Sequence, residues 1–243
     1  MKKPMIPVID HPWKVSVSDA RKIQNQLKSQ LLHVSLTEMP GIIAAVDVSY
    51  TRWDHMGYAV LGIYRVEYDN EVHGIRLQEL LIETYTGTVE FPYVPGYLSF
   101  REIPMLLPLF QRIDMDIDLI IADGVGIAHP RGLGLASHLG LLFDKPSIGC
   151  AKSKLIGNYL EPGEEKGEYS DLFIKEQTVG SVLRSKRHCK PLFVSPGYKC
   201  TIDDARKIVL DLCFDYRLCE PIRRVDAISK QLRKSTNTEW SKL

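Results

Sequence analysis

The chain has 243 residues, of which 44% are hydrophobic and 25% are charged, which places it among ordinary globular proteins. Lys and Arg number 31 against 30 Asp and Glu, so a net charge of +1 excludes a general electrostatic attraction to nucleic acid or membranes. A polyanion would therefore bind at a local patch. We expect a single domain over residues 1–243, because α/β folds often run to about 200–250 residues as one unit.

The five cysteines form no CxxC pair and repeat no spacing, which argues against a disulfide framework or a zinc ribbon. The first residues lack the apolar stretch of a signal peptide. No run of residues approaches the roughly 18 apolar positions that cross a membrane. We therefore expect a monomer in the reducing cytoplasm, with no membrane partner.

The first half of the chain predicts one helix and then three strands, over residues 16–32, 42–50, 58–68 and 74–86. In the helix, apolar residues recur every three or four positions, and Ser16 or Ser18 would cap it. The first strand is an unbroken apolar run with a single carboxylate inside it, which is typical of a central strand. The three strands would form an antiparallel meander, because only a turn-rich segment separates the last two.

The second half alternates strands, expected over 118–123, 146–150, 178–183 and 191–195, with helices over 134–143, over 203–213 and from Glu220 onward. Such alternation favours parallel strands joined by crossovers. We interpret residues 161–169 as a charged surface loop and expect the chain to fray after about residue 234. The fold expected is α/β: a mixed sheet, an antiparallel meander followed by parallel strands, with helices on both faces.

Two carboxylates stand where such a sheet presents functional groups. Asp47 interrupts the apolar run of the central strand, where an ionised carboxylate is costly unless it is paired or binds a metal. Taken alone, a salt bridge to a buried Lys or Arg explains it as well as a metal or catalytic role does. Asp123 ends another apolar strand, and ligands gather at the carboxyl ends of the strands. It could equally be a turn residue.

A third carboxylate, Glu102, lies three positions after Ser99, and Ser-x-x-Glu is the pattern of a helix capping box. However, Pro104 and Pro108 would disrupt a regular helix, which weakens a purely structural account. Three carboxylates from separate segments, without a histidine pair or cysteine cluster nearby, favour a hard cation such as Mg²⁺. Oxygen-rich Mg²⁺ sites commonly serve phosphoryl transfer.

Two loops have compositions that suit nucleic-acid binding. At residues 91–97, two prolines hold Tyr93 on a stiff segment, which suits a wedge that stacks on or replaces a base; a buried proline-aromatic turn is the alternative. The glycine-rich residues 124–134 lead into a helix, and such loops let backbone amides approach phosphates or a base edge. This loop is not a Walker loop, and His129 alone is more often a structural histidine.

Basic and acidic residues elsewhere leave two interpretations open in each case. Lys152 directly follows a strand, so it faces either the cleft of Asp123 or solvent. Residues 184–190 form the densest basic stretch, which is either a phosphate-backbone contact or a solvated hairpin. In the last helix, Asp226 lies at the edge of the apolar stripe and points toward the other carboxylates or toward water.

Together these segments resemble the endonuclease V family. The resemblance rests on Val-Asp-Val-Ser at 46–49, Phe-Pro-Tyr-Val-Pro-Gly at 91–96, Phe-Arg-Glu at 100–102, Asp-Gly-Val-Gly at 123–126, His-Pro-Arg at 129–131, Gly-Leu-Ala-Ser-His at 134–138, Ile-Gly-Cys-Ala-Lys at 148–152 and Glu-Pro at 220–221. These motifs follow one another in order from about Gly41 to Asp226. Each motif is unspecific, but their combination is specific, and it implies a ribonuclease H-like fold.

The resemblance implies a Mg²⁺-dependent nuclease, with Mn²⁺ as a substitute, that acts on deaminated nucleic acid. Such enzymes recognise hypoxanthine, the base of deoxyinosine, and cut the second phosphodiester bond on its 3′ side, leaving 3′-hydroxyl and 5′-phosphate ends. We therefore expect a DNA-repair hydrolase whose partner is DNA containing deoxyinosine. The alternatives are an endoribonuclease specific for inosine in RNA and a protein that binds deaminated bases without cutting them.

The resemblance also implies roles for individual residues. Asp47, Glu102 and Asp123 would hold the metal and act in catalysis, and Asp226 matches a position where members carry His or Asp near the metal. Lys152 would assist at the scissile phosphate. The substrate would be bound by the wedge and the surroundings of the base pocket, namely Tyr93, Gly96, Leu98, Gly124, His129 and Arg131.

Two positions depart from the family pattern. Val125 stands where relatives usually carry a polar residue, and Tyr198 replaces a frequent histidine. Neither change removes an expected metal ligand, so both bear on the pocket and on substrate preference. The His-Pro-Arg motif at 129–131 has a bacterial or archaeal form, which weakly favours DNA over RNA.

Overall fold

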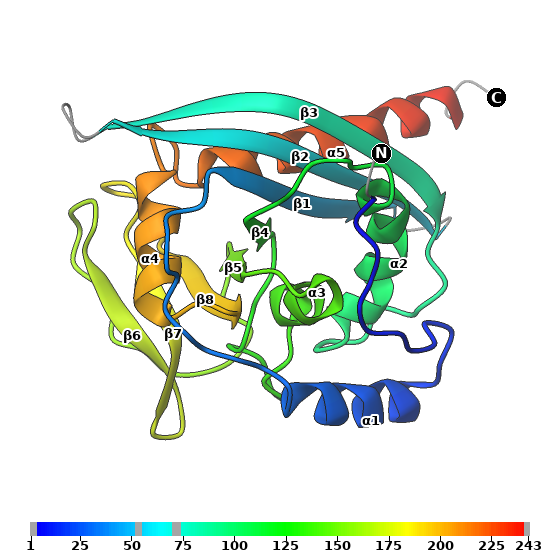
Figure 1. Cartoon of the computed structure of the whole chain (residues 1–243), viewed down its shortest axis with the longest axis horizontal. Coiled ribbons are helices and arrows are strands. Elements are labelled where there is room, and N and C mark those ends of the chain that lie inside the picture. The colour runs from blue at the N-terminus through cyan, green and yellow to red at the C-terminus, as the bar shows by residue number, and fades with distance from the viewer. Residues whose placement is uncertain (1–3, 52–54, 70–73, 241–243) are drawn as a thin grey trace.

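The computed structural model describes residues 4–51, 55–69 and 74–240 (Figure 1). The helices in this part of the chain are α1 (Val17–Lys28), α2 (Leu98–Phe110), α3 (Leu135–Phe143), α4 (Ile202–Asp211) and α5 (Glu220–Trp240). The strands are β1 (Ile42–Tyr50), β2 (Met56–Asp69), β3 (Gly74–Thr88), β4 (Leu119–Ala122), β5 (Ser147–Ala151), β6 (Tyr169–Ile174), β7 (Gln177–Leu183) and β8 (Leu192–Tyr198).

The strands form one eight-stranded sheet in the order β3-β2-β1-β4-β5-β8-β7-β6. β1, β2 and β3 pair antiparallel as a meander, while β1, β4 and β5 run parallel. This confirms the mixed sheet. The parallel part is shorter than the sequence indicated, because β8, β7 and β6 add to β5 in antiparallel pairs. The edge strand β6 was not predicted, since only Leu172 of its residues is buried.

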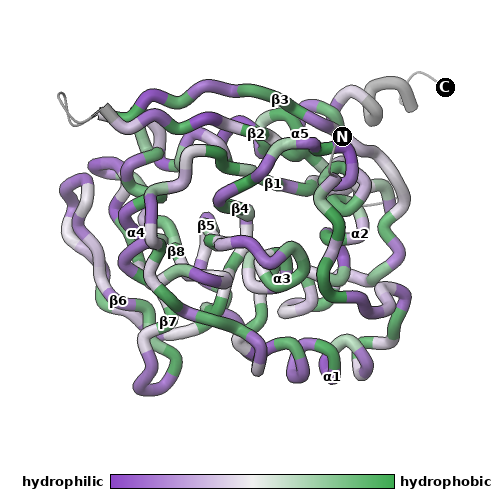
Figure 2. The backbone as a smooth tube through the Cα atoms, viewed as in Figure 1, coloured by the Kyte–Doolittle hydropathy of each residue, from purple (hydrophilic) through white to green (hydrophobic). Residues whose placement is uncertain are grey.

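Helices cover both faces of the sheet, and the alternation of β1 shows which face meets which helix. Ile43 and Ala45 pack in a buried cluster with residues of α4 and α5. Ala44, Val46 and Val48 point the other way and pack with residues of α2 and α3. The strand β1 is therefore buried between these layers and is hydrophobic on both faces, as its green stretches in Figure 2 show.

The helix α2 is continuous through Pro104 and Pro108, which corrects the expectation that these prolines would interrupt it. Four of its side chains, those of Ile103, Leu106, Leu109 and Phe110, are completely buried. This burial outweighs the hydrogen bonds that the prolines cannot donate, because tertiary packing supplies most of the stability of a protein helix. The capping box was also wrong: α2 begins after Tyr97, without a side-chain cap.

The ends of the first helix and the start of the last can be compared with the prediction. Ser16 caps α1, as expected, and accepts a hydrogen bond from the Asp19 amide at 3.1 Å, but the helix ends at Lys28 rather than near residue 32. The helix α5 begins at Glu220, as predicted.

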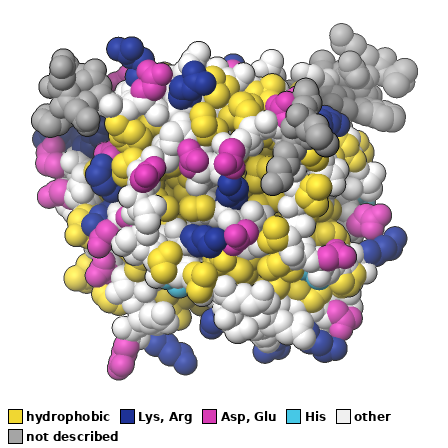
Figure 3. All heavy atoms as spheres, viewed as in Figure 1, with side chains coloured by type: hydrophobic (Ala, Val, Ile, Leu, Met, Phe, Trp, Pro, Cys, Tyr) yellow, Lys and Arg dark blue, Asp and Glu magenta, His cyan; other side chains and the backbone are white. Residues whose placement is uncertain are grey.

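Charges of both signs are interspersed on the face shown in Figure 3, with hydrophobic side chains between them. This agrees with the near-balance of acidic and basic residues in the sequence. Among the described segments, none of the helices combines the length and apolarity that a bilayer crossing requires.

The segment before α1 is fixed to α3 by a pair of histidines. Nε2 of His11 lies 2.8 Å from Nε2 of His138, and Nδ1 of His11 lies 3.1 Å from the Pro12 carbonyl. Because the Nδ1–H of His11 donates to that carbonyl, its Nε2 accepts and His138 donates. Burial, with a smaller contribution from His11, lowers the pKa of His138 to about 3.

We expect this buried histidine to make the protein sensitive to acid. The unfolded chain binds a proton at His138 below a pKa of about 6.5, whereas the folded chain does so only near 3. The unfolded state therefore binds more protons in this interval, and the free energy of unfolding falls as the pH is lowered through it. Urea titrations at several pH values give the free energy of unfolding as a function of pH. Its slope against pH should be smaller for His138→Gln than for the unaltered protein; an identical slope would contradict the assignment.

Candidate active site

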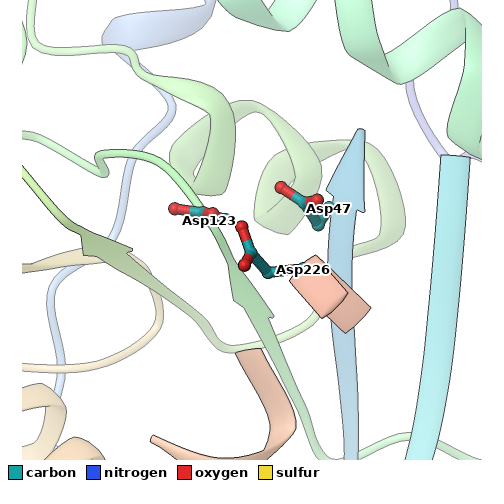
Figure 4. A group of neighbouring side chains, drawn as sticks. All are labelled: Asp47, Asp123 and Asp226. Carbon is teal, nitrogen blue, oxygen red and sulfur yellow. The ribbon is translucent and has the colours of Figure 1, made fainter. Parts of the chain in front are cut away.

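The strand register brings two of the predicted carboxylates together. In the parallel pair of β1 and β4, Val46 lies opposite Ala122. Asp47 and Asp123 are the next residues along the two segments, so they lie side by side at the carboxyl end of this pairing. Asp226 approaches them from α5. One carboxylate oxygen from each of these three residues lies within 4.8 Å of the others. Figure 4 shows the three side chains gathered together, with Asp47 projecting from β1 and Asp226 approaching from α5.

Lys152 neutralises part of this acidic group. It follows directly after β5 and donates to Oδ2 of Asp123 and to Oδ1 of Asp226. A second cation, Lys230, contacts Oδ2 of Asp226 at 2.7 Å. Burial would raise the pKa of Asp226, but hydrogen bonds from Lys152 and Lys230 lower it below its usual value. Burial opposes the charge on Lys152, yet the two carboxylates raise its pKa, so its ammonium group stays charged.

Asp47 is compensated differently, by a hydroxyl group that the sequence analysis missed. Ser229 of α5 donates from Oγ to Oδ2 of Asp47, and its carbonyl accepts from the Ser49 hydroxyl at 2.7 Å. Burial and the charge of Asp123 raise the pKa of Asp47 to about 7. The available signal was the position of Ser229 three residues after Asp226, because this spacing places both on one helix face.

Glu102 lies outside the group of three. It is buried on α2, and burial together with the charge of Asp47 raises its pKa well above the usual range. Burial and the charge of Glu102 in turn raise the pKa of Tyr50. The structure therefore brings three of the four expected acidic residues together, with Glu102 close enough to feel the charge of Asp47.

The donor set fits a divalent metal ion. Three carboxylate oxygens at this separation repel one another, and oxygen ligands of this kind suit hard cations. Within residues 4–51, 55–69 and 74–240, no second group of three histidine, cysteine or acidic residues meets the same distance condition. The acidic group is therefore compatible with a divalent metal site.

A cavity of about 290 Å³ opens beside the acidic group, at the lower end of the size range of ligand sites, roughly 300–1,000 Å³. Asp123 and Lys152 line it, and so do five residues expected at the substrate, namely Tyr93, Gly96, Leu98, Gly124 and His129. The side chain of Tyr93 is 75% exposed. Of the two departures from the family pattern, Val125 lines this cavity, whereas the Tyr198 hydroxyl donates to Asp144 at 3.0 Å.

The glycine-rich loop uses some of its amides internally rather than presenting them to a ligand. The amide of Gly126 donates to Oγ of Ser195 at 2.8 Å, and that of Ile127 donates to the Pro196 carbonyl at 2.9 Å. A Cβ atom at Gly126 would lie 2.0 Å from the Pro196 oxygen, so only glycine allows this approach. These contacts fix the loop against β8, and these two amides form no phosphate cradle.

The basic stretch at 184–190 is not organised as a phosphate site at Arg184. This side chain is buried, donates from Nε to the Gly163 carbonyl at 2.9 Å, and pairs with Glu161 at 2.8 Å. Arg187 pairs with Glu165 at 2.9 Å. Arg184 therefore ties the loop before β6 to the end of β7.

The segment after Tyr93 forms a tight turn. The amide of Tyr97 donates to the Val94 carbonyl at 3.1 Å, and Gly96 has a φ angle of +81°. Proline followed by a glycine of positive φ is the sequence and geometry of a type II turn. The turn at residues 94–97 therefore separates the exposed Tyr93 from Leu98, the first residue of α2.

His129 and Arg131 support this turn from behind. His129 Nε2 lies 2.9 Å from the Gly96 carbonyl, and Arg131 Nη2 donates to the same oxygen. Burial and the charge of Arg131 lower the pKa of His129 to about 4, so His129 is neutral and carries its proton on Nε2. The guanidinium of Arg131 stacks 4.1 Å from the centre of the Tyr97 ring and is not part of the cavity wall.

A mixed sheet with helices on both faces, and with carboxylates gathered where the parallel pairing of β1 and β4 ends, is typical of nucleases of the ribonuclease H-like fold. The chain belongs to the endonuclease V family, because the family model "Endonuclease V" matches residues 24–227. An endonuclease V of Kosmotoga olearia is 41% identical over 228 residues, covering 93% of this chain and 96% of its own.

Two solved structures support the same assignment. The crystal structure of endonuclease V from Streptomyces avermitilis has a TM-score of 0.82 and 34% identity, and the match covers 94% of this chain and 98% of that one. Endonuclease V from Ciona intestinalis has a TM-score of 0.75 and 25% identity, with 90% and 98% coverage. The Ciona protein was solved in complex with a 23mer DNA containing an inosine followed by a ribo-adenosine.

We expect the affinity of the site for Mg²⁺ to rise with pH and to level off above about 7. The pKa of Asp47 in the metal-free protein is about 7, so at lower pH the metal has to displace a proton, at a cost of up to about tenfold in affinity per pH unit. Isothermal titration calorimetry over about pH 5.5–8.5 measures this dependence.

The matched variant for this titration is Asp47→Asn, which keeps the size of the side chain and removes its titration. It should bind Mg²⁺ more weakly and with a flatter pH dependence. An affinity for the unaltered protein that is the same at both ends of the pH range would contradict a role for Asp47 as a ligand.

Proposed function

We propose that the chain is a Mg²⁺-dependent DNA-repair endonuclease that recognises deoxyinosine and hydrolyses the second phosphodiester bond on its 3′ side, leaving 3′-hydroxyl and 5′-phosphate ends. The observation that carries this proposal is that the two sites adjoin: Asp123, a member of the acidic group, and Lys152, its ion-pair partner, both line the cavity beside Tyr93. Membership of the family and the inosine-containing complex of the Ciona protein support it.

Asp47, Asp123 and Asp226 are the residues that would hold Mg²⁺, with Glu102 as a further ligand from α2. When bound, the ion supplies an activated water and neutralises charge on the phosphate, and Mn²⁺ can take its place. Ser229 holds the Asp47 carboxylate in its orientation. The ammonium group of Lys152, kept charged by its carboxylate neighbours, stabilises the negative charge that develops at the scissile phosphate.

Recognition of the lesion uses the cavity and the exposed tyrosine. Extruding a base from a duplex costs a few kcal/mol, and less when the base is mispaired. The weakened pairing of hypoxanthine therefore favours its extrusion over that of a normal base. Tyr93 fills the vacated place in the stack. The extruded base enters the cavity between Gly96, Leu98 and Gly124, where backbone groups read the hypoxanthine edge and the walls leave no room for the exocyclic amine of guanine.

Inosine in RNA is the second candidate substrate, because the nucleic acid bound by the Ciona protein carries a ribo-adenosine after the inosine. The two substrates share the base and differ in the sugar. Matched DNA and RNA duplexes with one deoxyinosine or inosine separate the two candidates, since a DNA enzyme cuts the first more rapidly and a ribonuclease cuts the second. A protein that only binds deaminated bases would retain both without cutting either.

The test of the proposed function is a nicking assay on a duplex with one deoxyinosine. We expect a single Mg²⁺-dependent nick at the second phosphodiester bond 3′ of the lesion. Asp123→Asn should lower the rate by more than about 100-fold, since changes of groups that only support a metal ligand already cost 10–100-fold. The same substitution at the exposed Asp171 of β6 is the matched control and should leave the rate unchanged.

Intact strands across Mg²⁺, Mn²⁺ and a range of pH would overturn the nuclease proposal for this substrate. Unaffected nicking by Asp123→Asn would remove that residue from the mechanism. Retained binding of the lesion duplex by a variant that no longer nicks it would show that recognition and hydrolysis use separate parts of the site.

A further inference from the structure

Gln24 is a buried polar residue in the middle of α1, a helix whose other polar residues face solvent. It lies on the inner stripe of α1, beside Ala20 and Leu27, and is 1% exposed. The apolar members of this stripe already pack α1 against its neighbours. Burying an amide costs free energy unless its polar atoms are hydrogen-bonded, so an apolar residue would serve the docking of the helix better.

The amide group of Gln24 connects three segments that meet behind the cavity. Its Nε2 donates to the Gly96 carbonyl at 3.1 Å and to the Leu133 carbonyl at 3.3 Å. Its Oε1 accepts from Nε of Arg131. Gln24 therefore links the turn at 94–97, the His-Pro-Arg motif and the residues that lead into α3, and both ends of its amide are used.

The Gly96 carbonyl is the point at which this network acts on the turn. It accepts from Gln24, from His129 at 2.9 Å and from Arg131. A carbonyl oxygen has two lone pairs, and here three donors share them. These three hydrogen bonds restrict rotation of the peptide group that carries the oxygen. A Cβ atom at Gly96 would lie 2.7 Å from Nη2 of Arg131, which shows how closely the network approaches the turn.

Tyr93 depends on this turn for its position. It directly precedes the turn, and its own side chain is 75% exposed, so packing around its ring fixes it little. The residues after it are held firmly, because Tyr97 is buried under Arg131. A wedge that is exposed at its tip has to be positioned from its base.

We propose that Gln24 is a positioning residue for lesion recognition: through the Gly96 carbonyl it holds the turn at 94–97 so that Tyr93 enters the stack in the right place. The inference rests on the proposed function, and it adds the N-terminal helix α1 to the recognition apparatus. Gln24 belongs neither to the acidic group nor to the residues that line the cavity, and it contacts the cavity wall only through the carbonyls of Gly96 and Leu133. A change of Gln24 should therefore lower the nicking of duplex substrates, which require the wedge, more than the nicking of single strands.

The test compares nicking of deoxyinosine in a duplex with nicking of the same strand unpaired. Gln24→Met preserves length and removes all three hydrogen bonds, and we expect it to lower the ratio of kcat/KM values, duplex over single strand, by about tenfold, the scale of one base-stacking contact. Gln24→Glu keeps an acceptor for Arg131 but loses the donor to Gly96, and it should resemble Gln24→Met.

A double-mutant cycle with Tyr93→Ala tests whether Gln24 acts through the wedge. If it does, Gln24→Met adds little to the loss caused by Tyr93→Ala, because the two residues act on one step. Leu27→Ala is the control for stability: it removes a buried side chain of the same helix, outside the hydrogen-bond network, and should leave the ratio unchanged. Additive losses in the cycle, or an equal fall in the ratio for Leu27→Ala, would overturn the proposal.

Hydrogen–deuterium exchange separates this proposal from the proposed function. Gln24→Met should raise exchange at residues 92–98 relative to Leu27→Ala, whether or not the protein cuts DNA. Raised exchange in a protein that cuts no inosine substrate would mean that Gln24 holds the turn but that the nuclease proposal fails, and with it the role in recognition. Unchanged exchange would show that Gln24 does not hold the turn.

Discussion

Mutual repulsion among three carboxylates within 4.8 Å of one another is the constraint on which the site depends. The parallel register of β1 and β4 fixes Asp47 beside Asp123, and α5 brings Asp226 to the same edge. Lys152 and Ser229 offset part of the repulsion. Burial together with the repulsion that remains raises the pKa of Asp47 to about 7, and a divalent cation would relieve the repulsion.

In the proposed function, the chemistry and the recognition of the substrate meet because one loop contributes to both. It begins at Asp123 in the acidic group, continues along the cavity wall and reaches His129 behind the turn at 94–97. Internal hydrogen bonds to β8 keep the loop close to the sheet. The catalytic side is thus built on the rigid sheet, whereas Tyr93 projects from a turn that is held only at its base.

The sequence predicted the charged part of this site well and the uncharged part poorly. Asp47 could be found because a single carboxylate inside an apolar strand needs a partner, and Asp123 because it ends the next strand. Ser229 and Gln24 were missed, since a neutral polar residue on a helix is equally common on a solvated face; the spacing from Asp226 placed Ser229 on the right helix face, but only tertiary contacts show that either residue is buried. The expectation that Pro104 and Pro108 would interrupt α2 was wrong for a related reason: burial of the helix outweighed the low helix preference of proline.

The most direct test of the account is anomalous diffraction from crystals of the protein grown with Mn²⁺. The account predicts a manganese peak in contact with carboxylate oxygens of Asp47 and Asp123, with Asp226 beside it and Lys152 displaced from its present hydrogen bonds. Manganese bound only elsewhere on the protein, with the three aspartates still arranged as in Figure 4 and Lys152 still paired with Asp123 and Asp226, would contradict it.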